Sequence, residues 1–118
     1  MSRQKILIIL MVVVGFFVMV NVAKAKPPRN MNLSYDLQSQ MLHVEVEHVC
    51  DNRNNEYIHK VTISINRGVP EKKYYGKQRD HLMFIQDIAV TAKVGDVIKV
   101  AVYAKEGGFL EGSLVVAE

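Results

Sequence analysis

The strongest constraint on this chain is an alternation of apolar and polar residues that recurs in three separate stretches. Leu42, Val44 and Val46 alternate with polar neighbours, and the same two-residue period returns at 61–65 and 98–102. Side chains two positions apart lie on the same face of a β-strand, so each stretch predicts a strand with one buried and one solvent-exposed face. No window of about 12 or more residues carries an apolar stripe of helical spacing, which predicts an all-β fold.

Further strands are expected where short apolar or aromatic stretches lie between turn-forming residues. The strand candidates are 32–36, 72–75, 81–90 and 112–116, and the turn candidates are 51–55, 66–68, 76–80, 95–96 and 107–108. About seven short strands, spaced about ten residues apart without an intervening helix, are typical of two packed antiparallel sheets. We therefore predict an all-β, immunoglobulin-like antiparallel β-sandwich of about seven strands, formed by one domain over 31–118.

The first 25 residues have the pattern of a secretory signal peptide. Two basic residues precede an apolar run over 6–20, and Ala23 and Ala25 supply the small side chains expected before a cleavage site. This run is shorter than the about 20 apolar residues that a membrane-spanning helix needs. We predict a signal peptide over 1–25, an extended lead-in over 26–30, and export to the bacterial periplasm or the exterior. Anchoring by an uncleaved N-terminal segment is the alternative.

The net charge of +3 belongs to this N-terminal segment. The segment holds three of the 15 Lys and Arg residues and none of the 12 Asp and Glu residues, so the remainder of the chain is neutral. A neutral exported domain lacks the electrostatic attraction that drives binding to nucleic acid or to an anionic membrane surface. We expect no nucleic-acid partner and no stable membrane insertion after cleavage. The expected partner is another protein or a second copy of the chain.

The single cysteine, Cys50, excludes a disulfide framework within one chain. Cys50 and His48 continue the parity of the alternating stretch at 42–46, which places both at the end of a core face. If Glu56 or His59 folds back beside them, these four residues form a candidate metal site, because imidazole, thiolate and carboxylate groups bind transition metals. The simpler interpretation is a buried cysteine beside a hydrogen-bonded histidine, with no cofactor bound.

Three stretches of the chain together resemble the iron-binding domain of desulfoferrodoxins and superoxide reductases. They are the strand end EH at 47–48, the string EYIHKV at 56–61 and the string KVGDVIKVAVYAKEGG at 93–108. The corresponding family patterns are similar to H-[WY]-I-x-x-I and E-Y-C-N-x-H-G. The resemblance covers 31–116 and implies the immunoglobulin-like sandwich of that family.

The resemblance also implies an iron site whose ligands are mostly replaced in this chain. In the family, four histidines hold ferrous iron in a plane, one axial cysteine binds below, and the sixth position receives superoxide. His48 matches one ligand histidine, whereas Glu56 stands at the next ligand position. Ala104 stands at the axial cysteine and Gly107 at the last histidine. Because the thiolate pushes electron density toward the bound oxygen species, its replacement by alanine implies that superoxide reductase activity is lost.

We therefore expect a small exported binding or structural module with a degenerate iron site and no catalytic residue. One alternative is a redox protein that retains iron or another metal through a rearranged set of His48, Glu56, His59 and Cys50. A second alternative is a sulfur-carrier or disulfide-linked subunit that uses Cys50. The strand at 95–100 is loosely similar to the small immunoglobulin-like carriers of thiosulfate-oxidising systems.

The signal-peptide interpretation predicts that the exported protein begins at Lys26. Intact-mass measurement on protein expressed from the full-length sequence should give the mass of 26–118, because signal peptidase cuts after a small residue. The Ala25→Phe variant places a bulky side chain at the cleavage site and should keep the mass of the whole chain. A wild-type product that retains Met1 would contradict the prediction.

Overall fold

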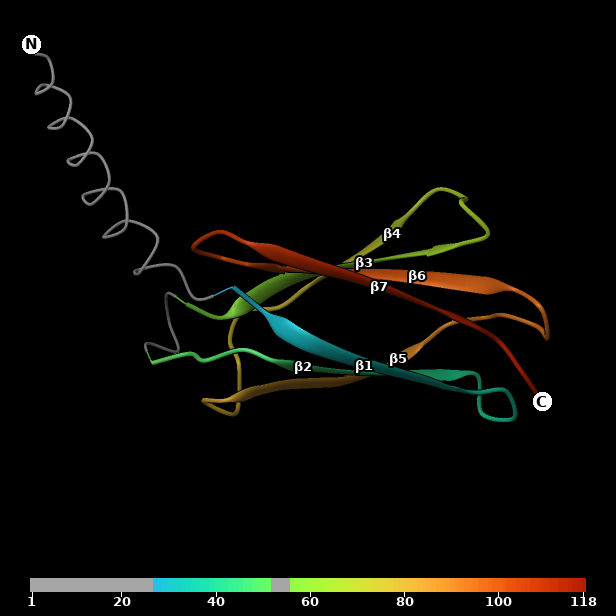
Figure 1. Cartoon of the computed structure of the whole chain (residues 1–118), viewed down its shortest axis with the longest axis horizontal. Helices are drawn as coiled ribbons and strands as arrows, with labels where there is room; N and C mark the ends of the chain where they lie inside the picture. Colours follow the sequence, from blue (N-terminus) through green and yellow to red (C-terminus); the bar gives the residue numbers. More distant parts are fainter. Residues whose placement is uncertain (1–26, 52–55) are drawn as a thin grey trace, which may run out of the picture.

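A computed structural model of the chain describes residues 27–51 and 56–118, which form seven β-strands and no helix. The strands are β1 (Arg29–Asp36), β2 (Met41–Glu47), β3 (Ile58–Ile65), β4 (Glu71–Tyr74), β5 (Met83–Ala89), β6 (Val97–Ala104) and β7 (Phe109–Val115). Every strand pair is antiparallel. The predicted all-β fold of about seven antiparallel strands is confirmed (Figure 1).

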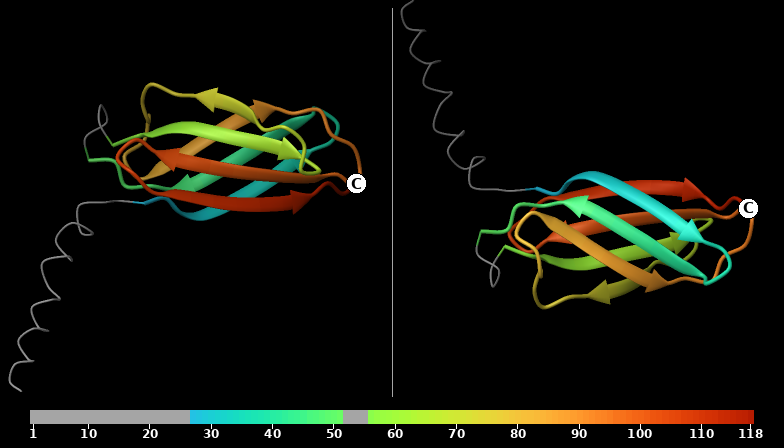
Figure 2. Two further views of the ribbon diagram at one scale, coloured as in Figure 1. Left: turned by 90° about the horizontal axis from the view of Figure 1, so that it is seen from above. Right: turned by 90° about the horizontal axis from the view of Figure 1, so that it is seen from below.

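The strands form two sheets that pack face to face as a β-sandwich. The three-stranded sheet has the order β1-β2-β5, and the four-stranded sheet has the order β4-β3-β6-β7. The chain changes sheet between β2 and β3, between β4 and β5, and between β5 and β6 (Figure 2). As a result, the end of β2, the start of β3, the start of β5 and the turn between β6 and β7 lie at one end of the sandwich (Figure 1).

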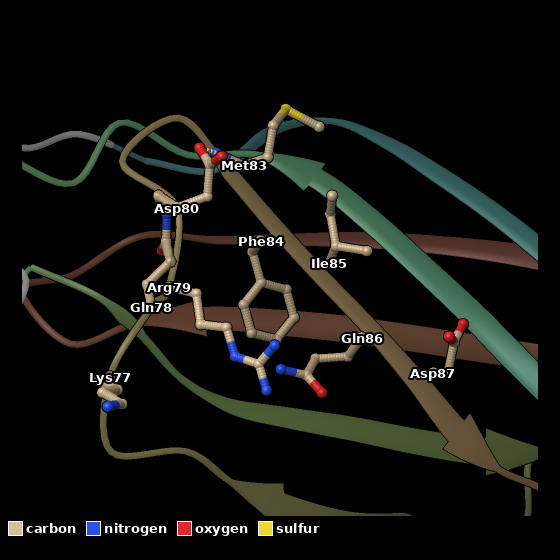
Figure 3. A pocket seen from close by; sticks show the side chains of 9 residues that line it. All are labelled: Lys77, Gln78, Arg79, Asp80, Met83, Phe84, Ile85, Gln86 and Asp87. Atoms are coloured by element: carbon tan, nitrogen blue, oxygen red, sulfur yellow. Dashed lines mark hydrogen bonds between the residues drawn. The ribbon is translucent and has the colours of Figure 1, made fainter.

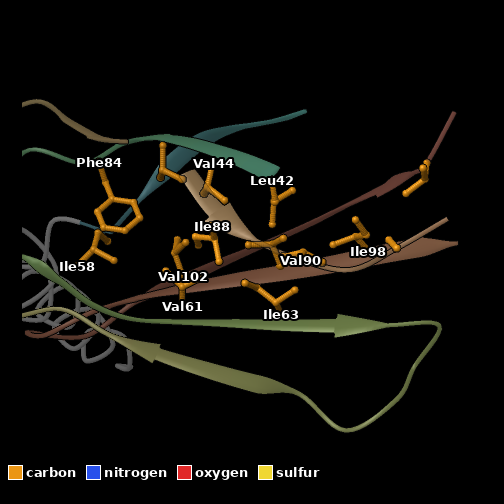
Figure 4. Close-up of a cluster of buried hydrophobic side chains, with 14 of the residues drawn as sticks. Leu42, Val44, Ile58, Val61, Ile63, Phe84, Ile88, Val90, Ile98 and Val102 are labelled. Carbon is orange, nitrogen blue, oxygen red and sulfur yellow. The ribbon is translucent and has the colours of Figure 1, made fainter. Parts of the chain in front are cut away.

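The core lies between the sheets and consists of the residues that the two-residue period predicts. Leu42, Val44 and Val46 of β2 are fully buried and belong to one cluster with Val61 and Ile63 of β3 (Figure 4). The cluster also contains Ile58, Phe84, Ile88, Val90, Ala92, Ile98, Val100, Val102, Ala104 and Val116. Burial of each large aliphatic side chain contributes about 1.5–3 kcal/mol, so this layer is the main source of stability.

The start of β5 differs from the predicted strand at 81–90, because β5 begins only at Met83. The carboxylate of Asp80 explains the difference. Its Oδ1 atom accepts hydrogen bonds from the backbone N–H groups of Leu82 at 2.8 Å and Met83 at 3.1 Å. An aspartate that binds backbone groups two and three residues ahead favours a turn over a ladder, and so delays the strand.

β1, β3 and β7 begin clearly before their predicted starts, β3 at Ile58 rather than at 61. β7 begins at Phe109 rather than at 112, because Gly107 has a φ of 115° and lets the chain reverse directly after β6. β1 begins at Arg29, inside the predicted lead-in over 26–30, and its register with β2 shifts between Arg29 and Asn32. At the remaining strand ends, the observed strand agrees with the predicted stretch to within one residue or extends past it.

Some of the predictions concern residues outside the described ranges. The predicted signal peptide over 1–25 and residues 52–55 of the predicted turn belong to this group. Cleavage and export therefore stay predictions. Within 27–51 and 56–118, no helix has the length and apolar character needed to cross a membrane.

A hydrogen-bonded carboxylate network lies at the other end of the sandwich, where β6 begins. Asp96 is only 8% exposed, and its side chain accepts the backbone N–H of Lys93 at 3.0 Å and the side-chain N–H of Asn66 at 3.0 Å. Asn66 also accepts the backbone N–H of Val97 at 2.8 Å and so joins the turn after β3 to the start of β6. The bond from Lys93, followed by that from Asn66, holds the pKa of Asp96 below its ordinary value of 3.8.

This pKa shift predicts acid sensitivity that one substitution removes. Because the pKa of Asp96 is lower in the folded than in the unfolded chain, its contribution to stability is present above about pH 4 and is lost as the pH falls through the folded-state value. Between about pH 5 and about pH 3, the urea midpoint of the wild-type protein should therefore fall more steeply than that of Asp96→Asn. Urea titrations of both proteins at several pH values measure the two slopes. Equal slopes would contradict the prediction.

Candidate functional site

A buried polar network around Gln78 organises the end of the sandwich where β2 ends. Gln78 is 2% exposed, and its side-chain amide nitrogen donates to the backbone carbonyls of His48 at 2.9 Å and Asp80 at 2.8 Å. Its Oε1 atom lies 2.8 Å from Nδ1 of His48 and 3.4 Å from the backbone nitrogen of Ile58. One side chain thus joins the end of β2, the start of β3 and the segment before β5.

These bonds also assign the protonation of His48, which is itself 2% exposed. Because the amide nitrogen of Gln78 donates to two carbonyl groups, its oxygen is the atom that faces the histidine ring. Nδ1 of His48 then donates its hydrogen to that oxygen, so in the neutral form of the ring the lone pair lies on Nε2. A histidine that binds a metal through one ring nitrogen usually donates its other N–H to a protein oxygen in this way.

A small pocket beside this network brings together the positions that the family resemblance assigns to iron ligands. It is lined by His48, Glu56, Ala104, Glu106 and Gly107. Its volume of about 10 Å³ is room for roughly one water molecule. Four of the five lining residues are the positions matched to ligands of the superoxide reductase site.

The turn between β6 and β7 explains why the two replaced ligand positions lie together. The backbone N–H of Ala104 donates to the carbonyl of Gly108 at 3.0 Å, and that of Gly107 donates to the carbonyl of Ala104 at 3.1 Å. Positive φ angles at Gly107 and Gly108 allow this tight reversal. Backbone hydrogen bonds and glycine conformation therefore account for the turn, and Ala104 and Gly107 present no donor side chain to the pocket, whereas Glu106 of the same turn presents a carboxylate.

The donor set at this pocket does not fit the iron centre of the family. His48 supplies one imidazole and Glu56 one carboxylate, whereas Ala104 and Gly107 supply neither the thiolate nor the second imidazole. Glu106 adds one carboxylate that the resemblance does not predict. Among the residues that the structure describes, no group of three or more His, Cys, Asp and Glu side chains is placed to hold a metal ion.

The other two residues of the predicted metal set do not line this pocket. Cys50 lies beyond His48 with no exposed surface, and its backbone N–H donates to the carbonyl of His81 at 2.7 Å. The predicted parity, which puts His48 and Cys50 on the core side, is confirmed. His59 lies near the start of β3, where its carbonyl accepts the backbone N–H of Tyr75 at 2.9 Å and its Nδ1 atom is buried without a hydrogen-bond partner.

Two residues of this region were not found from the sequence. Gln78 lies in the stretch 76–80, which predicts only a turn, and a single glutamine there has no period that would indicate burial. Glu106 lies between the two replaced ligand positions, where the family pattern has no ligand. The sequence next to Gln78 and Glu106 does not indicate that they lie at this site. Their positions depend on packing against segments that lie far away along the chain.

Comparison with protein-family models, with curated proteins and with solved structures gave no match to this chain. The likeness to superoxide reductase domains therefore depends on the three sequence stretches. The meeting of His48, Glu56, Ala104 and Gly107 at one pocket is what that likeness would require. The family assignment stays a proposal.

The Gln78 network predicts a large loss of stability when its amide is removed. In Gln78→Met, a side chain of similar size leaves the ring N–H of His48 and two carbonyls unpaired, and each buried unpaired group costs about 1–3 kcal/mol. We expect a loss of about 2 kcal/mol or more in the free energy of unfolding, measured by urea denaturation. Gln38→Met changes an exposed glutamine and should stay within about 0.5 kcal/mol of the wild-type value. Equal losses in the two variants would contradict the prediction.

Proposed function

We propose that this chain is an exported, immunoglobulin-like binding module with the scaffold of a superoxide reductase domain but not its reactive iron centre. The observation that carries the proposal is the pocket at the matched ligand positions. It joins His48 and Glu56 with two positions, Ala104 and Gly107, that have no donor group. The chain keeps the scaffold residues of that site and lacks the chemistry.

Loss of the axial thiolate is the decisive difference for activity. In the family that the chain resembles, superoxide is reduced by an iron that gives up one electron, and thiolate donation tunes that iron. The methyl side chain of Ala104 has no electron pair to donate, and the backbone N–H of this residue is already hydrogen-bonded within the turn. Binding of another molecule is therefore the function that this scaffold supports best.

A metal protein remains the second candidate, because one observation favours it. Gln78 holds His48 as the surroundings of a ligand histidine commonly do, with Nε2 left as a lone-pair donor. Glu56 lines the same pocket and Glu106 adds a second carboxylate there, whereas His59 or Cys50 would have to move toward His48 to join them as ligands. The sulfur-carrier interpretation is less favoured, since a fully buried thiol such as Cys50 reacts slowly with external partners.

Metal content and metal-dependent stability distinguish the first two candidates. We expect substoichiometric iron, zinc, copper and manganese by elemental analysis of protein expressed from the full-length sequence, and no catalysed loss of superoxide. We also expect no change of melting temperature on anaerobic addition of Fe²⁺ or on addition of Zn²⁺, because only an ion that binds the folded state raises it.

A rise in melting temperature that His48→Gln removes and His43→Gln retains would overturn the proposal and support the metal protein. His43 is the matched control because its Nδ1 atom faces Asp87 on the outer side of the sandwich, 2.6 Å away. A mass adduct on Cys50 that disappears with reductant would instead support the sulfur carrier.

A further inference from the structure

The four edge strands of the sandwich are protected to different degrees. β1 and β7, the last strands on one side of the two sheets, pack against each other. The approach is so close that a Cβ atom added at Gly112 of β7 would lie 2.8 Å from the sulfur of Met31. The two edge strands therefore close the space between the sheets on that side of the sandwich.

The opposite side is formed by β4 and β5, of which only β4 has the usual protection of an edge. β4 is four residues long and carries Lys72 and Lys73, and short charged strands resist pairing with other chains. β5 is seven residues long, has Asp87 as its one charged residue, and contains no lysine or proline. Its outer edge has no strand partner among the described residues.

A groove of about 520 Å³ runs beside this open edge (Figure 3). Such a volume is typical of pockets that hold a ligand. The groove lies between the segment 77–80 and β5, and Phe84 and Gln86 line it (Figure 3). The ring of Phe84 packs edge to face against Tyr75, with ring centroids 5.3 Å apart and planes at 80°. This contact with Tyr75 fixes the position of the Phe84 ring in the wall of the groove.

Two basic and two acidic side chains line the groove, and they differ in whether they already have partners. Of its two carboxylates, Asp80 accepts backbone N–H groups at the start of β5, and Asp87 lies 2.6 Å from Nδ1 of His43. Lys77 and Arg79 are exposed and form no ion pair with another described residue. Two cations without a partner beside an open strand edge complement a carboxylate-bearing ligand.

A second copy of the chain would not supply a carboxylate beside Lys77 and Arg79. In a two-fold antiparallel pairing of β5 with β5, the C-terminal end of one β5 would lie toward Lys77 and Arg79 of the other copy. That end is Ile88 and Ala89, which carry no carboxylate. The nearest acidic residue, Asp87, is already engaged by His43.

We propose that the open edge of β5 binds an extended, acidic peptide segment of another exported protein. The segment adds as an antiparallel strand, so its C-terminal end lies beside Lys77 and Arg79 and carries the carboxylates. Main-chain hydrogen bonds to β5 supply affinity, and Ile85, which is 47% exposed, offers apolar contact. This inference rests on the proposed binding function and names its partner class.

The test uses a defined probe, the peptide Thr-Val-Thr-Val-Thr-Glu-Glu with an N-terminal fluorescein and a C-terminal amide. Its seven residues match the length of β5. Fluorescence anisotropy should show saturable binding to protein expressed from the full-length sequence. Replacement of both glutamates by lysine, or methylation of alternate backbone nitrogens, should each weaken binding by about tenfold or more. Amide hydrogen exchange should slow within 83–89 when the peptide is bound.

Charge reversal on the protein provides matched variants. Arg79→Glu removes a groove cation and should weaken binding by about tenfold, whereas Lys72→Glu alters an exposed lysine on β4 and should leave it unchanged. Equal binding of the N-methylated peptide, equal binding of the lysine peptide, equal effects of the two variants, or no binding at all would each overturn the inference. Concentration-dependent dimerisation that protects 83–89 without peptide would overturn it in favour of a second copy.

Failure of the peptide inference can be distinguished from failure of the proposed function. Absence of peptide binding by protein that is also free of metal would overturn this inference alone. Stoichiometric metal that depends on His48 would overturn the proposed function, whichever result the peptide gives.

Discussion

The side-chain amide of Gln78 is the contact on which the site end of this sandwich depends. It holds the ring and carbonyl of His48 directly after β2, lies next to the first backbone nitrogen of β3, and binds the carbonyl of Asp80 before β5. These segments come from both sheets, so the amide sets how the sheets meet at this end. Inside a low-dielectric core such a network is stabilising only when every member is paired, which is the case at Gln78.

The same network positions two surfaces with different chemistry. On one side, His48 lines the small pocket together with Glu56, Ala104, Glu106 and Gly107. On the other side, Gln78 anchors the segment 77–80 whose exposed cations border the groove along β5. The network has a structural role whatever the pocket binds, because removal of Gln78 would leave buried polar groups unpaired.

Much of the fold was predictable, and the reasons are visible in particular residues. The burial of Leu42, Val44 and Val46 followed from a period of two, and the same parity placed His48 and Cys50 on the core side. The start of β5 was not predicted, because a side-chain contact made by Asp80 decides it. The candidate site was predictable only in part: the approach of Glu56 to His48 was one of the alternatives that the sequence left open, whereas no sequence pattern indicated the burial of Gln78.

The sequence by itself determined which face of each strand is buried, where the chain turns, and that alanine and glycine stand at positions 104 and 107. These are local properties, set by side-chain parity, glycine conformation and residue chemistry. Only the tertiary structure decided that Gln78 joins His48, 30 residues away, and that among the described residues no strand pairs with the outer edge of β5 beside Lys77 and Arg79. The physical reason is that pairing between distant strands depends on the combined burial of all seven strands, which no single stretch encodes.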